Sequence, residues 1–318
     1  MITLNTDKGL VKIESWDDIE SRPGFVKNID PAKHKLASII GRYIFKEKIR
    51  CGLSNCHTPH ATRHTPHATR HMPHAKGYIV ATTEGLETNI GKDCGTREFS
   101  VDFETLSKKF ERDITQKEYR DTLWSFSYQL EELEKRSTEL RRANNGADWI
   151  YDNTRPLINR NSGCPDEVVR MITSMIKTRS NVIFTEREAT SNEIDNLEAI
   201  ENRTLRRPHY IEVPIAELVG VEALYPENNL REILVKDLET NIRHFKEKDI
   251  NSLTYAELKH WVKWIGSVEI TLDKAVNIVA MGCRLLDRAN LSPFLNILDR
   301  KEDDRLFRKY LRSLSDVV

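Results

Sequence analysis

The chain has 318 residues, of which 39% are hydrophobic and 31% charged, and its 49 Lys and Arg residues balance its 49 Asp and Glu residues. This composition allows one large or two smaller globular domains, and a formal net charge of zero disfavours binding to polyanions through overall charge. No apolar run approaches the roughly eighteen residues needed to span a bilayer, and the N-terminus lacks a signal-peptide pattern. We therefore expect a cytoplasmic protein with no membrane partner. Its five cysteines, an odd number, fit a reducing compartment better than a disulfide framework.

The first fifty residues predict a β-hairpin followed by a helix. Apolar and polar residues alternate from Ile2 to Leu4 and recur from Leu10 to Ile13, with a turn between them. Asp30-Pro31 has the form of a helix start, an N-cap followed by proline at the first helical position. We expect that helix to run through Ile40 and to end at Gly41.

Three cysteines in residues 51–95 predict a small metal-binding knuckle. Cys51 and Cys56 form one cluster and Cys94 a second, just before a predicted helix at residues 101–110. Residues 77–83 and 86–90 read as two short strands joined at Glu84-Gly85. Thiolates in such an order suit a tetrahedral, structural Zn²⁺ site, although the C-x4-C spacing also fits ordinary buried thiols.

The fourth ligand of this site is expected to be a histidine. The candidates are His57, His60 and His74, and our predicted ligand set is Cys51, Cys56, Cys94 and His60.

A tandem repeat separates the knuckle from the hairpin. Residues 57–63, His-Thr-Pro-His-Ala-Thr-Arg, recur identically at 64–70, and a partial third copy follows. A proline in each unit and the lack of apolar periodicity predict a mobile insertion over residues 57–74. Its histidines can bind stray metal without enforcing a geometry.

Residues 115–143 carry a heptad pattern. Thr115 and Glu118 match a capping box, and apolar residues follow at alternate spacings of four and three. A second apolar run extends from Val276 to Leu298 and occupies more of a helix than one core-facing stripe requires. We expect a homo-oligomer that uses one of these surfaces; the alternative is that both pack inside the chain. The predicted interface residues are Leu123, Phe126, Leu130, Leu133, Cys283 and Leu285.

Helical patterns fill most of the remaining chain. Pro165 begins an amphipathic helix next to Cys164, which reads as a structural thiol. Asn228 and a second capping box, Thr254 with Glu257, begin helices of a C-terminal bundle. The predicted fold is α+β and mainly α: an N-terminal region with the knuckle (1–113), a helical region with the heptad helix (114–207) and a helical bundle (208–318).

Motifs of enzymatic chemistry are missing from the sequence. The segment from Gly85 to Asp93 resembles a phosphate-binding loop but has five residues between its glycines, and Asp93 stands where a hydroxyl should bind Mg²⁺. No H-E-x-x-H, G-x-S-x-G or G-x-G-x-x-G occurs. We therefore expect a protein that is not an enzyme.

The pattern Cys51…Cys56…Gly91-Lys92-Asp93-Cys94 resembles zinc-knuckle units of phage and prophage proteins. The whole chain is similar in organisation to phage inhibitors of the Gabija anti-defence family, which implies a non-enzymatic oligomer that binds and inhibits a bacterial antiviral complex. The alternative is a zinc-dependent nucleic-acid-binding regulator. Local basic patches for that alternative are Arg203, Arg206 and Arg207, or Lys108, Lys109 and Arg112, and the balanced total charge disfavours it.

Overall fold

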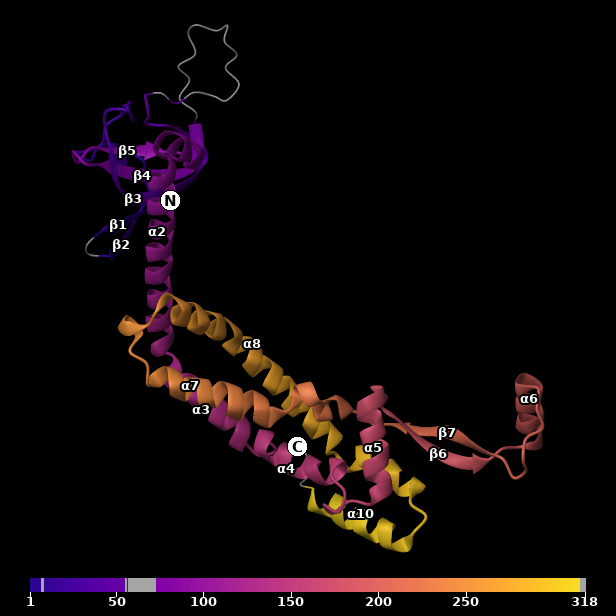
Figure 1. The fold of residues 1–318 in the computed structure, drawn as a ribbon. Coiled ribbons are helices and arrows are strands. Elements are labelled where there is room, and N and C mark those ends of the chain that lie inside the picture. The colour runs from indigo at the N-terminus through magenta and orange to yellow at the C-terminus, as the bar shows by residue number, and fades with distance from the viewer. Residues whose placement is uncertain (7–8, 55, 57–72, 315–318) are drawn as a thin grey trace. The chain divides into compact units, whose positions relative to one another are not determined.

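The computed structural model describes residues 1–6, 9–54, 56 and 73–314. The fold is α+β and mainly α, as the sequence predicts: a small antiparallel sheet lies near the N-terminus, and helices make up most of the rest (Figure 1). The chain divides into two compact units. The first comprises Met1–Trp124 with Ile250–His260, and the second comprises Ser125–Asp249 with Trp261–Val318.

The first unit is built on a five-stranded antiparallel sheet with the order β2-β1-β3-β4-β5. The strands are β1 (Ile2–Thr6), β2 (Gly9–Ile13), β3 (Leu36–Arg50), β4 (Pro73–Thr82) and β5 (Glu87–Ile90), and the short helix α1 spans Asp17–Glu20. The hairpins β1–β2 and β4–β5 confirm two predictions from the sequence, and Gly85 takes a positive φ of 81° in the second turn.

The predicted helix at residues 30–40 is wrong, because β3 begins at Leu36. Asp30 caps a turn only, accepting a hydrogen bond from the Ala32 amide at 3.0 Å. Burial then alternates along the strand, with Ile39, Gly41 and Tyr43 facing the core, and this period of two identifies a half-buried strand. A Cβ on Gly41 would lie 2.5 Å from a methyl carbon of Leu4, so this glycine permits close packing of β1 instead of ending a helix.

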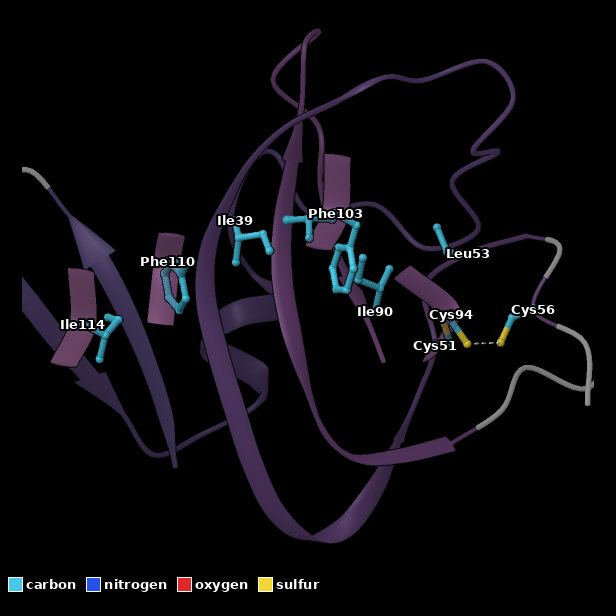
Figure 2. Packing of buried hydrophobic residues seen from close by; sticks show 10 residues of the cluster. Ile39, Cys51, Leu53, Cys56, Ile90, Cys94, Phe103, Phe110 and Ile114 are labelled. Carbon is cyan, nitrogen blue, oxygen red and sulfur yellow. Dashed lines mark hydrogen bonds between the residues drawn. The ribbon is translucent and has the colours of Figure 1, made fainter. Parts of the chain in front are cut away.

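Helix α2 (Lys92–Ser127) begins next to the last strand and carries one non-helical residue, Ser100. Its Phe103, Phe110 and Ile114 pack in a core cluster with Ile39, Val80 and Ile90 of the sheet (Figure 2). The predicted helix at 101–110 is thus part of α2. The capping box predicted at Thr115 does not start a helix, because α2 already runs through it and the Thr115 hydroxyl donates to the Glu111 carbonyl at 2.8 Å.

The predicted heptad helix at 115–143 is interrupted. Residues 128 and 129 form a turn between α2 and α3 (Leu130–Arg142), although the buried stripe of Leu123, Phe126, Leu130 and Leu133 continues across it.

The second unit consists of helices and one two-stranded ribbon. After α3 come α4 (Ala147–Ile158), α5 (Asp166–Thr178), α6 (Ser191–Glu201), the π-helical segment η3 (Arg231–Glu239), α7 (Thr240–Lys246), α8 (Tyr255–Leu285), α9 (Arg288–Leu291) and α10 (Lys301–Ser313), together with short 3-10 turns; α8 begins in the first unit. Strands β6 (Val182–Glu188) and β7 (Tyr210–Glu217) pair antiparallel, and α6, which lies between them in the chain, stands at the end of this ribbon (Figure 1).

The sequence predicted the start of one helix correctly and placed the start of another helix one residue too early. The capping box at Thr254 forms as predicted: the Thr254 amide donates to the Glu257 carboxylate at 2.9 Å, and the Glu257 amide donates to the Thr254 hydroxyl at 3.4 Å. At η3 the cap is Asn229, not Asn228, since the Asn229 side chain accepts from the amides of Arg231 and Glu232. An aromatic cluster forms part of the core of this unit: Phe126, Phe245, Trp261 and Trp264.

Candidate metal centre

Four side chains from separate segments of the first unit converge on one point. Cys51 follows β3, Cys56 lies beyond it, His74 is the second residue of β4, and Cys94 lies in the first turn of α2. One ligand atom of each residue lies within 4.8 Å of all the others. The three cysteines are at most 3% exposed.

The distances fit a tetrahedral ion. A metal about 2.3 Å from each sulfur and about 2.0 Å from the nitrogen holds its donors roughly 3.5–3.8 Å apart. The Sγ atoms of Cys56 and Cys94 are 3.4 Å apart, and Cys94 Sγ is 3.4 Å from His74 Nε2. Figure 2 shows the three sulfurs directed toward one another at the edge of the core. These four residues could hold a metal ion.

The backbone around Cys51 is shaped to receive that sulfur. The amides of Leu53 and Gly91 donate to it, an arrangement that favours the thiolate. The Gly52 amide donates to the Asn89 carbonyl at 2.7 Å, and the Asn89 side chain donates to the Arg50 carbonyl at 2.8 Å. Residues on both sides of Cys51 are therefore hydrogen-bonded to Asn89, the last residue of β5 but one.

The loop before β3 braces the same turn from outside. The Ile29 amide donates to the Gly52 carbonyl, and the Ser54 amide donates to the Ile29 carbonyl, each at 2.9 Å. Ile29 and Leu53 are both buried. The Cys51 turn is thus fixed by backbone hydrogen bonds on two sides.

Small residues make room for the other two ligands. A Cβ on Gly91 would lie 2.5 Å from three atoms of the His74 ring, so the imidazole lies directly against the Gly91 backbone. A Cβ on Gly95 would lie 2.5 Å from the Phe103 ring. Glycines on both sides of Cys94 therefore allow His74 and the core to approach this end of α2.

Electrostatics within the cluster favour one thiolate over another. The hydrogen bond from the Cys94 thiol, aided by backbone amides, lowers the pKa of Cys51 against the opposing effect of burial. The same hydrogen bond and burial raise the pKa of Cys94 to about 12. A metal ion must therefore displace the proton of Cys94 when it binds.

The structure brings together three of the four predicted ligands: Cys51, Cys56 and Cys94. His57 and His60 lie outside the described residues, and His74 occupies the fourth position. A signal for His74 exists in the repeat, because His60, His67 and His74 are the same position of successive units and His74 is the copy that joins a strand. Comparing the sequences of the three copies does not by itself show which histidine joins the cysteines.

The predicted interface residues lie elsewhere and are covered within one chain. Leu123 and Leu285 are fully buried, Leu133 is 3% exposed, and Phe126 and Leu130 are each 6% exposed. Cys283 is partly buried, and its thiol donates to the Asn145 carbonyl at 3.4 Å. The alternative stated above, packing inside the chain, accounts for their burial, because side chains already in contact with their own chain offer no apolar surface to a second copy.

Cys164 is buried next to the start of α5. Burial raises its pKa to about 12, so its sulfur stays protonated at neutral pH, as expected of a structural thiol.

No protein-family model matches the chain, no curated protein is significantly similar to it, and no solved structure matches it. Among the described residues, no helix has the length and apolar character needed to cross a membrane.

Proposed function

We propose that the first unit binds one structural Zn²⁺ through Cys51, Cys56, His74 and Cys94. Thiolates are soft donors, and together with an imidazole they suit the borderline-soft Zn²⁺ over Mg²⁺ or Ca²⁺. The observation that carries this proposal is the convergence of the four donor atoms within 4.8 Å in a buried site.

The same observation supports a non-enzymatic role for the metal. Catalytic zinc sites keep one coordination position open for water or substrate, whereas structural sites fill all four positions with protein ligands. Here four protein donors are available and three are almost fully buried. The ion would tie the end of β3, the start of β4 and the start of α2 together.

A zinc-stabilised binding protein is therefore the function that we infer. The first unit supplies a scaffold whose surface strands are held in place by metal, and a partner binds to that surface. The partner implied by the resemblance, a bacterial antiviral complex, and self-association of the chain both stay predictions.

Cobalt substitution tests two points together: whether the metal site exists, and whether protein ligands fill all four of its coordination positions. Co²⁺ in a Cys₃His site should give tetrahedral d–d bands and sulfur-to-cobalt charge-transfer bands, and added azide or cyanide should leave them unchanged, because no position is open. Cys94→Ser should weaken or abolish these bands, whereas Cys283→Ser, outside the cluster, should preserve them. A spectrum that shifts with azide would overturn the structural role, and absence of sulfur charge transfer would overturn the site.

Metal that binds non-specifically to the histidine repeat would add to the measured metal content, so the repeat is deleted for this measurement. Deleting residues 60–73 joins Pro59 to His74 and removes two repeat units while keeping the ligand next to Ala75. Metal content should then be one ion per chain in this variant and fall toward zero when Cys94→Ser is added.

A further inference from the structure

Exposed cations flank the metal centre on the two strands that enter and leave it. Lys46, Lys48 and Arg50 are exposed on β3, and Arg50 directly precedes Cys51. On β4, Lys76 is exposed and lies two residues after His74. The four residues Lys46, Lys48, Arg50 and Lys76 are called the β3–β4 basic face below.

The register of the two strands brings these cations to one end of the hairpin. Arg50 is opposite Pro73, and Ile49 is opposite His74, whereas Lys76 is opposite Ile44. Five steps along β3, from Ile44 to Ile49, therefore correspond to two steps along β4, from Lys76 to His74, and this irregularity lies in the stretch that holds Lys46 and Lys48. Such bulges re-aim side chains at sheet edges.

The positive charge of this face is poorly neutralised. None of its four cations forms an ion pair with another described residue, whereas neighbouring Arg42 binds Glu111 at 2.6 Å and Glu118 at 3.0 Å. Glu47 is the one acidic residue interspersed along this part of β3. From Lys48 to Thr83 the sequence contains no Asp or Glu, although the chain has 49 acidic residues.

We propose that the β3–β4 basic face binds the phosphate backbone of a nucleic acid. Closely spaced unpaired cations attract a polyanion through the local field even when the total charge is zero. The inference rests on the proposed function, because the metal would fix the ends of the strands that carry these cations. Contacts of this kind position a nucleic acid without reading its sequence.

Fluorescence anisotropy of the zinc-loaded full chain tests this surface. The probes are a short labelled DNA duplex of mixed sequence and a labelled single-stranded RNA, each titrated over a range of salt concentrations. Replacing Lys46, Lys48 and Lys76 with Gln should weaken binding at low salt by at least about tenfold. The slope of log K against log salt should fall by roughly two to three, about 0.9 for each lost phosphate contact on a duplex.

A charge-matched control separates the local surface from net charge. Lys135, Lys177 and Lys309 are exposed on helices of the second unit, and their replacement with Gln removes the same total charge. This triple variant should keep the wild-type affinity and salt slope. Equal losses in both triple variants would contradict the proposal, as would absence of wild-type binding at low salt.

Labelled poly-glutamate distinguishes a nucleic acid from an acidic protein surface. Binding to it as tight as to DNA and RNA would also overturn the proposal. Zinc measured in every sample keeps the two proposals separate: a chain with zinc but no nucleic-acid binding removes this inference alone, and a chain without zinc removes the metal site whatever it binds.

Discussion

A glycine allows the candidate metal ligands to approach one another. The His74 ring lies against Gly91, where a Cβ would come within 2.5 Å of three ring atoms. The clash would involve a ligand held on β4 and the backbone just before α2, and neither can move without changing the donor geometry. Gly91 thus contributes to the site by leaving room for the His74 ring, and not by adopting a backbone conformation that only glycine tolerates.

Gly91→Ala should weaken metal binding by about 10- to 100-fold, the usual effect of disturbing the surroundings of a metal ligand. Competition with a chromophoric chelator measures this affinity. Gly266→Ala is the matched control, because a Cβ there meets nothing within 4 Å and the residue lies inside α8. The control should keep the wild-type metal affinity and gain up to about 1 kcal/mol of helix stability. Equal metal affinities in the two variants would contradict this account of His74.

At the scale of elements, one arginine connects three segments of the second unit. Arg141 of α3 binds Asp148 of α4 at 3.0 Å and Glu239 at the end of η3 at 2.7 Å. These two carboxylates raise the pKa of the Arg141 guanidinium through hydrogen bonds. The Arg141 side chain is 24% exposed, so water screens these pairs less than it screens a surface ion pair.

Arg141→Gln should lower the free energy of unfolding of the second unit by about 1–3 kcal/mol, since two carboxylates lose their partner in a partly buried place. Arg308→Gln is the control: that arginine is 52% exposed and pairs with Asp304 along one helix. Its loss should cost no more than about 0.5 kcal/mol. Urea unfolding followed by tryptophan fluorescence measures both, and indistinguishable midpoints would refute the role given to Arg141.

We expect the fold to tolerate deletion of the histidine repeat. The deletion of residues 60–73 keeps His74 and shortens the chain between two ligands. Loop-closure entropy then changes stability by at most about 2 kcal/mol, in the favourable direction. The melting temperature should stay the same or rise, and a large fall would show that the repeat is structural.

At the scale of the whole molecule, burial within one chain accounts for the apolar character of the leucines in both stripes. Leu130 and Leu285 are 6% and 0% exposed, whereas Val276 is 52% exposed on the same helix as Leu285. A charge at either leucine would have to be buried without a partner.

Leu130→Glu and Leu285→Glu should therefore lose helical circular dichroism or melt at much lower temperature, because each costs several kcal/mol of folding free energy. Val276→Glu should remain folded with a near wild-type melting temperature. Circular dichroism and light scattering on the three variants measure fold and size. A Leu285→Glu chain that stays folded but becomes smaller than the wild type would restore the interface hypothesis.

Local patterns predicted several parts of this fold. Alternating apolar residues and short turns identified the hairpins β1–β2 and β4–β5, and a capping box located the start of α8 at Thr254. The clustered cysteines indicated three of the four residues that could hold a metal ion. The hairpin and helix-start predictions held because each depends on residues close together in the chain, where side-chain period and hydrogen bonding act directly on the backbone.

Tertiary contacts decided what those patterns left open. Residues 36–50 form a strand because β1 and β4 pair with it, even though Asp30-Pro31 has the local chemistry of a helix start. His74 lies with the three cysteines because β4 carries it to Gly91 and Cys94. The heptad stripe is buried within one chain because helices distant in sequence cover it, as Phe245 and Trp264 cover Phe126. A one-dimensional pattern specifies that a face is apolar, and only the folded chain specifies which surface buries it.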